Sequence, residues 1–287
     1  MPAPRPNTLK KVLSCSWPIV LTTCFFLIAG GNIQAQISEE QEADYQMIDR
    51  GLPAPEGESI DIEKTVNGII ERTNRFRKDN DLEPVQSDPE LTKAASMLAD
   101  FMARTHRYGH TADGRRPSGR AQAAGYRFCM VSENISYQYS SEGFEAEDLA
   151  KILTKGWKNS KGHRENMLGR YAKETGVAVA RSSRTGAYFA VQMFGRPRSA
   201  SLSIRLVNRS GVKRRYQVAL PDKPSSVRQF TLAPRAIRVH QRCRPAVVSF
   251  PDRDKKIEVD ASQVLRLVDS EGQFEVKVDP KKKEEAR

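Results

Sequence analysis

Three stretches in the first two thirds of the chain repeat apolar residues at three- and four-residue steps, the spacing of an amphipathic helix. The first begins near Ile62 and ends at the short polar residues 79–81, which favour a turn. The second begins at residues 87–90, where a cap residue precedes a proline and an acid, and extends to about Arg104. The third covers residues 146–158. The pattern predicts three helices, each with one buried face.

Strand-like runs lie between and after these helices. Residues 130–137, 174–180 and 187–194 are rich in β-branched, small and aromatic residues, and the turn-rich segment 181–186 separates the last two as in a hairpin. Helices on both sides of a small sheet make an α-β-α sandwich. We therefore predict an α+β fold, with an α-β-α sandwich over residues 62–198.

The pattern changes after the segment 195–198. Short alternating runs of apolar and polar residues follow, separated by turn residues, at 202–207, 216–220, 247–250 and 274–278. This pattern predicts a small all-β, sandwich-like module over residues 199–279. A charged tail over residues 280–287 follows it.

The first 35 residues have the layout of an export signal. Arg5, Lys10 and Lys11 precede the mostly apolar stretch 12–30, and Ala35 supplies a small residue for cleavage. We predict a signal peptide over residues 1–35 and a secreted, periplasmic or extracellular protein. An uncleaved membrane anchor is the alternative.

The segment that follows the signal, residues 36–61, is acidic and rich in proline, glycine and serine. Such a composition predicts a linker with little structure of its own. Two cysteines remain after export, Cys129 and Cys243, and they fall in the two predicted domains. Their spacing leaves a disulfide and two separate thiols equally open.

The positive charge of the chain is concentrated in its C-terminal part. The formal net charge is +12, and residues 198–287 contribute 21 Lys+Arg against 11 Asp+Glu, a net +10. Such a field attracts anionic partners such as cell-wall polymers or lipid head groups, and a merely solvated surface is the alternative. Aromatic residues do not interleave densely with the basic ones, so no specific nucleic acid partner is expected.

The chain has four histidines, and each can be weighed. His110 and His163, together with Glu133, form no compact metal motif by spacing, so helix caps and local hydrogen bonds are the simpler interpretation. His106 is interpreted as a helix-end residue. His240 and its arginine neighbours predict a solvated basic strand or, as the sharper hypothesis, an anion-binding face.

A set of ordered segments changes this weighing. They are Asn74–Arg77 with Leu82–Val85, Asp88–Ala95, Gly109–Thr111 with Asp113–Arg115 and Ala124–Tyr126, Ser132–Ile135, Trp157–Leu168, Gly176–Val177 and Gln192–Phe194. With them, residues 62–195 resemble the bacterial branch of the CAP superfamily, which groups cysteine-rich secretory proteins, venom antigens and plant pathogenesis-related proteins. The segments are specific as a set.

The resemblance implies a cleft that in the family usually holds two His and two Glu. His110, Glu133 and His163 match three of these positions, and Arg120 lies where a second Glu would be expected. The resemblance thus makes all four candidate ligand-binding residues. His110, His163 and Glu133 are also the candidate ligands of a divalent cation such as Zn²⁺.

Binding and catalysis both remain open for this cleft. A metal-bound water would be a nucleophile, or Glu133 and His163 would act as catalytic base and charge stabiliser. No activated Ser or Cys accompanies them, and Arg120 would repel a cation. We therefore expect a non-enzymatic protein that binds a cation or an extracellular lipid, polymer or peptide. A metal-dependent hydrolase, and a CAP scaffold carrying an anion-binding β module, are the alternatives.

Overall fold

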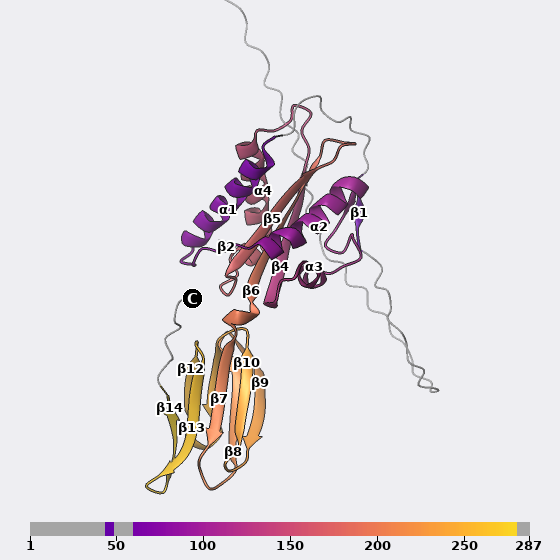
Figure 1. Cartoon of the computed structure of the whole chain (residues 1–287). Coiled ribbons are helices and arrows are strands. Elements are labelled where there is room, and N and C mark those ends of the chain that lie inside the picture. Colours follow the sequence, from indigo (N-terminus) through magenta and orange to yellow (C-terminus); the bar gives the residue numbers. More distant parts are fainter. Residues whose placement is uncertain (1–43, 49–59, 280–287) are drawn as a thin grey trace, which may run out of the picture.

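The computed structural model describes residues 44–48 and 60–279, which form two units placed end to end (Figure 1). The predicted signal peptide over 1–35 and the charged tail over 280–287 lie outside the described residues. Within the described residues, no helix is both long and apolar enough to span a membrane. The first unit runs to the end of strand β6 at Pro197, and the short helix η1 (Arg198–Ala200) leads into the second.

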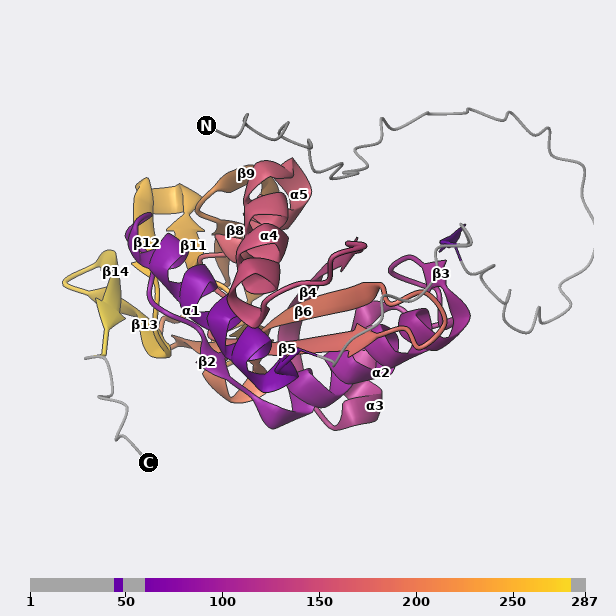
Figure 2. The ribbon, with the colours of Figure 1, turned by 90° about the horizontal axis from the view of Figure 1, so that it is seen from above.

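The first unit is a three-layer sandwich. Its elements are β1 (Gln46–Met47), α1 (Ile62–Lys78), β2 (Gln86–Ser87), α2 (Pro89–Thr105), β3 (Arg107–Tyr108), α3 (Pro117–Ala124), β4 (Phe128–Gln138), α4 (Ala146–Asn159), α5 (Lys161–Met167), β5 (Glu174–Arg181) and β6 (Tyr188–Pro197). The central sheet has the order β2-β5-β6-β4, antiparallel except for the parallel pair β2–β5. Figure 2 shows α1 and α4 on one side of this sheet and α2 and α3 on the other. The predicted α-β-α sandwich is confirmed.

Strand β6 explains why the layers hold together. Its side chains alternate between the two faces: Phe189 and Val191 pack with the core under α2, while Tyr188 and Ala190 pack with the core under α1 and α4. All of its residues from Tyr188 to Arg196 are buried. A strand covered on both faces reads as a continuous apolar run instead of an alternating one.

The helix starts follow from the sequence signals. Asp61 accepts a hydrogen bond from the backbone N–H of Lys64 (2.9 Å), and Asp88 accepts one from that of Leu91 (2.8 Å). Each side chain thereby satisfies one of the free donors in the first turn. The short helices α3 and α5 were not predicted, because neither repeats apolar residues over two turns.

The predicted linker over residues 36–61 needs one correction. Within its described part, Gln46 and Met47 pair with Tyr108 and Arg107, so residues 44–48 are held against the first unit. The amide of Ile48 also donates to the carbonyl of His106 (2.8 Å). Composition did not indicate this pairing, because a two-residue strand has no pattern of its own.

The second unit, here called the β module, is a sandwich of two four-stranded sheets. Its strands are β7 (Leu202–Asn208), β8 (Arg214–Leu220), β9 (Lys223–Leu232), β10 (Ile237–Arg242), β11 (Ala246–Phe250), β12 (Lys255–Val259), β13 (Gln263–Ser270) and β14 (Gln273–Val278), with the short helix η2 (Pro251–Arg253). The sheets have the orders β10-β7-β13-β14 and β12-β11-β8-β9. They enclose one apolar core that includes Ile204, Leu206, Tyr216 and Phe250. The all-β expectation is confirmed, although only four of the eight strands were named from the sequence.

A disulfide joins the two units. Cys129 lies at an irregular position of β4 and is bonded to Cys243, which follows β10, across 114 residues of sequence. Nearby, the amide of Arg198 donates to the carbonyl of Arg127 (2.8 Å), and Arg244 lies over the ring of Tyr171 (5.9 Å). The question that the sequence left open is thus resolved in favour of a bridge.

We expect the disulfide to hold the β module against the first unit. Replacing both cysteines by serine (Cys129→Ser, Cys243→Ser) removes a cross-link that closes a long loop, and should lower the free energy of unfolding by about 2–4 kcal/mol. Differential scanning calorimetry and limited proteolysis around residues 198–201 measure the change. Reductant should reproduce it in the wild-type protein and have no effect on the double variant. Equal stability of the wild-type protein and the double variant, both measured without reductant, would contradict the prediction.

Candidate functional site

The candidate site begins with a pair formed between β4 and the loop after β3. Glu133 is on β4, and its side chain is 1% exposed, whereas the side chain of His110 is 48% exposed. The Nδ1 atom of His110 lies 2.8 Å from Oε1 of Glu133. Because a carboxylate only accepts, Nδ1 carries the proton of this bond. In the neutral imidazole the lone pair is therefore on Nε2, the nitrogen that Glu133 does not hold.

The second oxygen of Glu133 is held by a buried arginine. Arg120, on α3, has no exposed surface and donates to Oε2 of Glu133 (2.6 Å) and to Oδ1 of Asp113 (2.7 Å). The same guanidinium donates to the carbonyls of Arg115 and His110 (2.8 Å each). One cation thus meets two carboxylates, which leaves this cluster with a net charge of −1. The repulsion that Arg120 was expected to exert on a cation is therefore offset.

His163 reaches the same region from α5. Asn134, the neighbour of Glu133 on β4, donates to the carbonyl of His163 (3.1 Å). Asn166 donates to the carbonyl of Glu133 (3.1 Å) and to the side-chain oxygen of Asn134 (2.9 Å). These bonds fix the start of α5 against β4. Burial lowers the pKa of His163 from its ordinary value of 6.5, and the charge of His110 lowers it further.

The structure links His110, Glu133 and Arg120 by direct contacts, whereas His163 joins them through its backbone carbonyl, to which Asn134 donates. His110 and His163 are accessible, His163 being half-buried. Arg120 has no surface with which to contact a ligand, and both oxygens of Glu133 are occupied. This geometry does not support direct ligand contact by Arg120 or a catalytic base at Glu133, because neither group faces solvent. Both are positioning residues. No group of three His, Cys, Asp or Glu suited to a metal is found in the described part of the chain.

Three residues of this cluster were missed as site residues from the sequence. Asp113, Asn134 and Asn166 all lie in segments that were quoted, yet no rule of spacing assigns them a partner. The available signal was that each of the segments Ser132–Ile135 and Trp157–Leu168 contains an Asn of this cluster, since Asn side chains bridge backbone groups of different elements.

A buried histidine, His106, forms a separate cluster. His106 ends α2 in the left-handed conformation (φ 59°), as the helix-end interpretation predicted. Its Nε2 lies 2.6 Å from the hydroxyl of Ser182, and Arg184 donates to its Nδ1. Since Arg184 only donates, Nε2 carries the proton and donates to Ser182. His106 therefore does not act as a base toward this serine, and the pair is structural.

The model of the Cysteine-rich secretory protein family, CAP, matches residues 70–194. This match covers the three layers and the whole His/Glu cluster. Residues 70–194 form a domain of the CAP superfamily.

Individual relatives of this CAP domain are distant. Protein YkwD of Bacillus subtilis is 28% identical over 130 residues, which is 45% of this chain and 46% of that protein, so the match spans about half of the relative. Among solved structures, an outer surface protein of Borrelia burgdorferi has a TM-score of 0.43 at 20% identity, over 49% of this chain and 98% of the other. An SCP-domain extracellular protein of Bacillus anthracis has a TM-score of 0.39 at 24% identity, over 47% and 41%.

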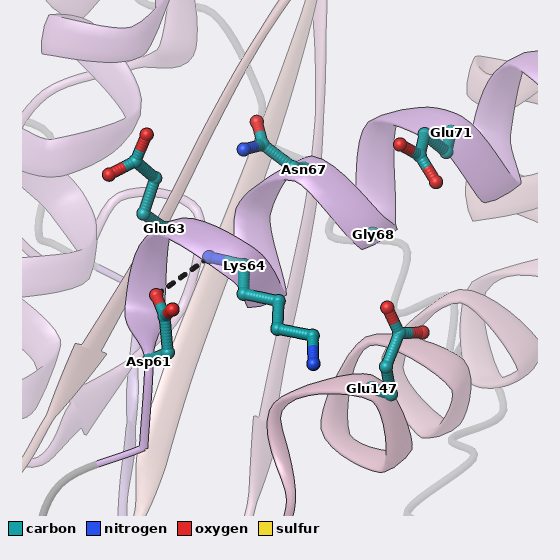
Figure 3. A pocket seen from close by; sticks show the side chains of 7 residues that line it. All are labelled: Asp61, Glu63, Lys64, Asn67, Gly68, Glu71 and Glu147. Carbon is teal, nitrogen blue, oxygen red and sulfur yellow. Dashed lines mark hydrogen bonds between the residues drawn. The ribbon is translucent and has the colours of Figure 1, made fainter.

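A different concavity of about 320 Å³ lies between the start of α1 and α4 (Figure 3). Asp61, Glu63, Glu71 and Glu147 line it, with Lys64 as the one cation among the lining residues. These groups are already explained by local structure. Asp61 caps α1, as the dashed bond in Figure 3 shows, and Glu147 forms an ion pair that joins α4 to α1.

The Arg120 pairing predicts a large cost for its removal. Arg120→Met leaves Asp113 and Glu133 as buried carboxylates without their cation, and breaking such a pair costs about 3–5 kcal/mol. Urea unfolding should show this loss in the free energy of unfolding. Arg116→Met, at the exposed residue that precedes α3, is the control and should change the free energy of unfolding by less than about 0.5 kcal/mol. Equal effects of the two variants would remove Arg120 from its positioning role.

The lowered pKa of His163 predicts a pH effect. Because the unfolded chain takes up the proton first, the free energy of unfolding should fall as pH drops below 6.5, until His163 also protonates in the folded state. An NMR titration should give a pKa for His163 below 6.5. His110→Ala should raise that pKa, since it removes a neighbouring positive charge. An unchanged value in His110→Ala would show that the two rings do not interact.

Proposed function

We propose that this protein is exported and that its CAP domain binds a divalent cation through the imidazoles of His110 and His163. One observation carries the proposal: Glu133 holds Nδ1 of His110, so that Nε2 of this exposed ring is the free nitrogen. A carboxylate behind an imidazole is the usual arrangement of metal-binding histidines, because it fixes the ring and raises its basicity.

The residues present fit such a cation in charge and in donor type. The Arg120 cluster has a net charge of −1, and the lowered pKa of His163 keeps this imidazole neutral at physiological pH, as a metal ligand must be. Neutral imidazole suits Zn²⁺ among the divalent cations. Two protein ligands leave the remaining coordination positions to water or to donors of an extracellular lipid, polymer or peptide.

Export is supported by two features of the chain. The first 35 residues have the layout of a signal peptide, and the Cys129–Cys243 disulfide belongs to an oxidising compartment. These features come from different parts of the chain. Together they favour a protein that acts outside the cytoplasm.

A metal-dependent hydrolase is the less supported function of the same site. A bound cation would supply Lewis-acid polarisation, but a hydrolase also needs a group that moves a proton. Glu133 does not offer one, because His110 and Arg120 occupy its two oxygens. His163 would be the remaining candidate for this step. We therefore favour binding over turnover.

The proposal predicts a zinc titration that depends on both rings. Isothermal titration calorimetry of the mature protein with Zn²⁺ should show one site, and His110→Ala or His163→Ala should weaken it at least about a hundredfold. Glu133→Gln should weaken it about 10–100-fold through lost positioning. Asp100→Asn, an exposed change on α2, is the control and should have no effect.

Two results would contradict the proposal. The first is no binding by the wild-type protein, and the second is binding that survives in His110→Ala,His163→Ala. Turnover of a peptide or cell-wall substrate that requires both rings and the metal would favour the hydrolase instead.

A further inference from the structure

In the β module, β9 and β10 each form one edge of the two sheets. Within the described residues, β10 pairs only with β7, and β9 pairs only with β8. Figure 1 shows the two strands side by side at one side of the sandwich. The rings of Phe230 on β9 and His240 on β10 are 4.7 Å apart, so the two edges meet through side chains.

The strand registers place basic side chains on the inner faces of both edges. On β10, Arg238, His240 and Arg242 lie opposite buried Leu206, Ile204 and Leu202 of β7. Residues directly opposite share a face of the sheet. By the same argument Arg228 of β9 lies opposite buried Val218, on the inner face of its own sheet.

Three arginines of these edges, Arg228, Arg238 and Arg242, have no acidic partner in the part of the chain that the structure describes. No carboxylate of the described residues forms an ion pair with Arg228, Arg238 or Arg242. Arg228 and Arg238 are exposed, and Arg242 is half-buried. Three guanidinium groups on the inner faces of these two edges, with no carboxylate partner among the described residues, form a local positive field, which an anion would neutralise.

Contacts among side chains hold this row in place. Arg238 lies over the ring of Phe230 (5.5 Å). The hydroxyl of the fully buried Tyr216 is 2.8 Å from Nε2 of His240. Burial and the charges of Arg238 and Arg242 lower the pKa of His240 from its ordinary value of 6.5.

We propose that the open edge between β9 and β10 binds a linear polyanion built from phosphate groups. Arg238, His240 and Arg242 occupy alternate positions and extend over about 13 Å, which is too long for a single small anion and suits an extended chain. Guanidinium groups bind phosphate oxygens in pairs and retain their charge at any physiological pH.

The experiment measures binding of linear inorganic polyphosphate to the mature full chain by fluorescence anisotropy. Arg238→Gln,Arg242→Gln should weaken binding about a hundredfold, since each charge-assisted contact is worth about tenfold. The slope of log Kd against log salt should fall by about two. Arg205→Gln,Lys277→Gln removes the same charge from exposed positions outside this edge and should have little effect. In the wild-type protein the imidazole NMR signals of His240 should shift on binding, and those of His110 should not.

A third variant separates loss of binding contacts from loss of folding. Arg238→Gln removes the contact with Phe230, so Arg228→Gln, which leaves that contact intact, is measured as well and should weaken binding about tenfold. Equal effects of the two double variants would overturn the proposal, because binding would then follow net charge alone. Equal binding of poly-glutamate would overturn the preference for phosphate, and absence of binding by the wild-type protein would overturn the site. None of these results depends on zinc binding by the CAP domain.

Discussion

The buried ion pair between Arg120 and Glu133 is the constraint on which the candidate site depends. A guanidinium with no exposed surface must be neutralised, and the carboxylates of Glu133 and Asp113 do this from two different segments. Once Arg120 takes one oxygen of Glu133, the other is left for His110. The pair thus fixes which nitrogen of His110 is free, without itself reaching the surface.

In this arrangement Glu133 and Arg120 hold other groups in place, whereas the family resemblance implied that both contact a ligand. The resemblance placed a ligand set of His and Glu in a cleft. In this chain Arg120 lies in the neighbourhood where a second Glu was expected. It forms an ion pair with Glu133, and both side chains are buried. What remains accessible is the pair of imidazoles of His110 and His163.

The β module carries basic side chains on its edge strands β9 and β10. Free edges of sheets expose backbone groups that can pair with other chains, and inward-pointing charges at an edge prevent such pairing. Arg228, Arg238 and Arg242 are placed to act in this way, and none of them has a carboxylate partner among the described residues. The Cys129–Cys243 disulfide links the module that carries them to the CAP domain.

The sequence by itself determined the features that depend on neighbours along the chain. Asp61 and Asp88 marked the starts of α1 and α2, because a cap acts on backbone groups three residues away. The apolar repeat predicted which face of each helix is buried, and the ordered segments predicted the family. The runs at β4, β5 and β6 were found because strand composition is also local.

Only the tertiary structure decided which distant groups meet. Packing of the helices and sheets decides that Arg120 meets Glu133 and that Cys129 meets Cys243. It also decides that the arginines of β9 and β10 lie on neighbouring edges. No spacing along the chain encodes these contacts. The same reason explains why α3 and α5 were missed: these short helices are stabilised by contacts such as Asn166 with Glu133, and not by a repeat of their own.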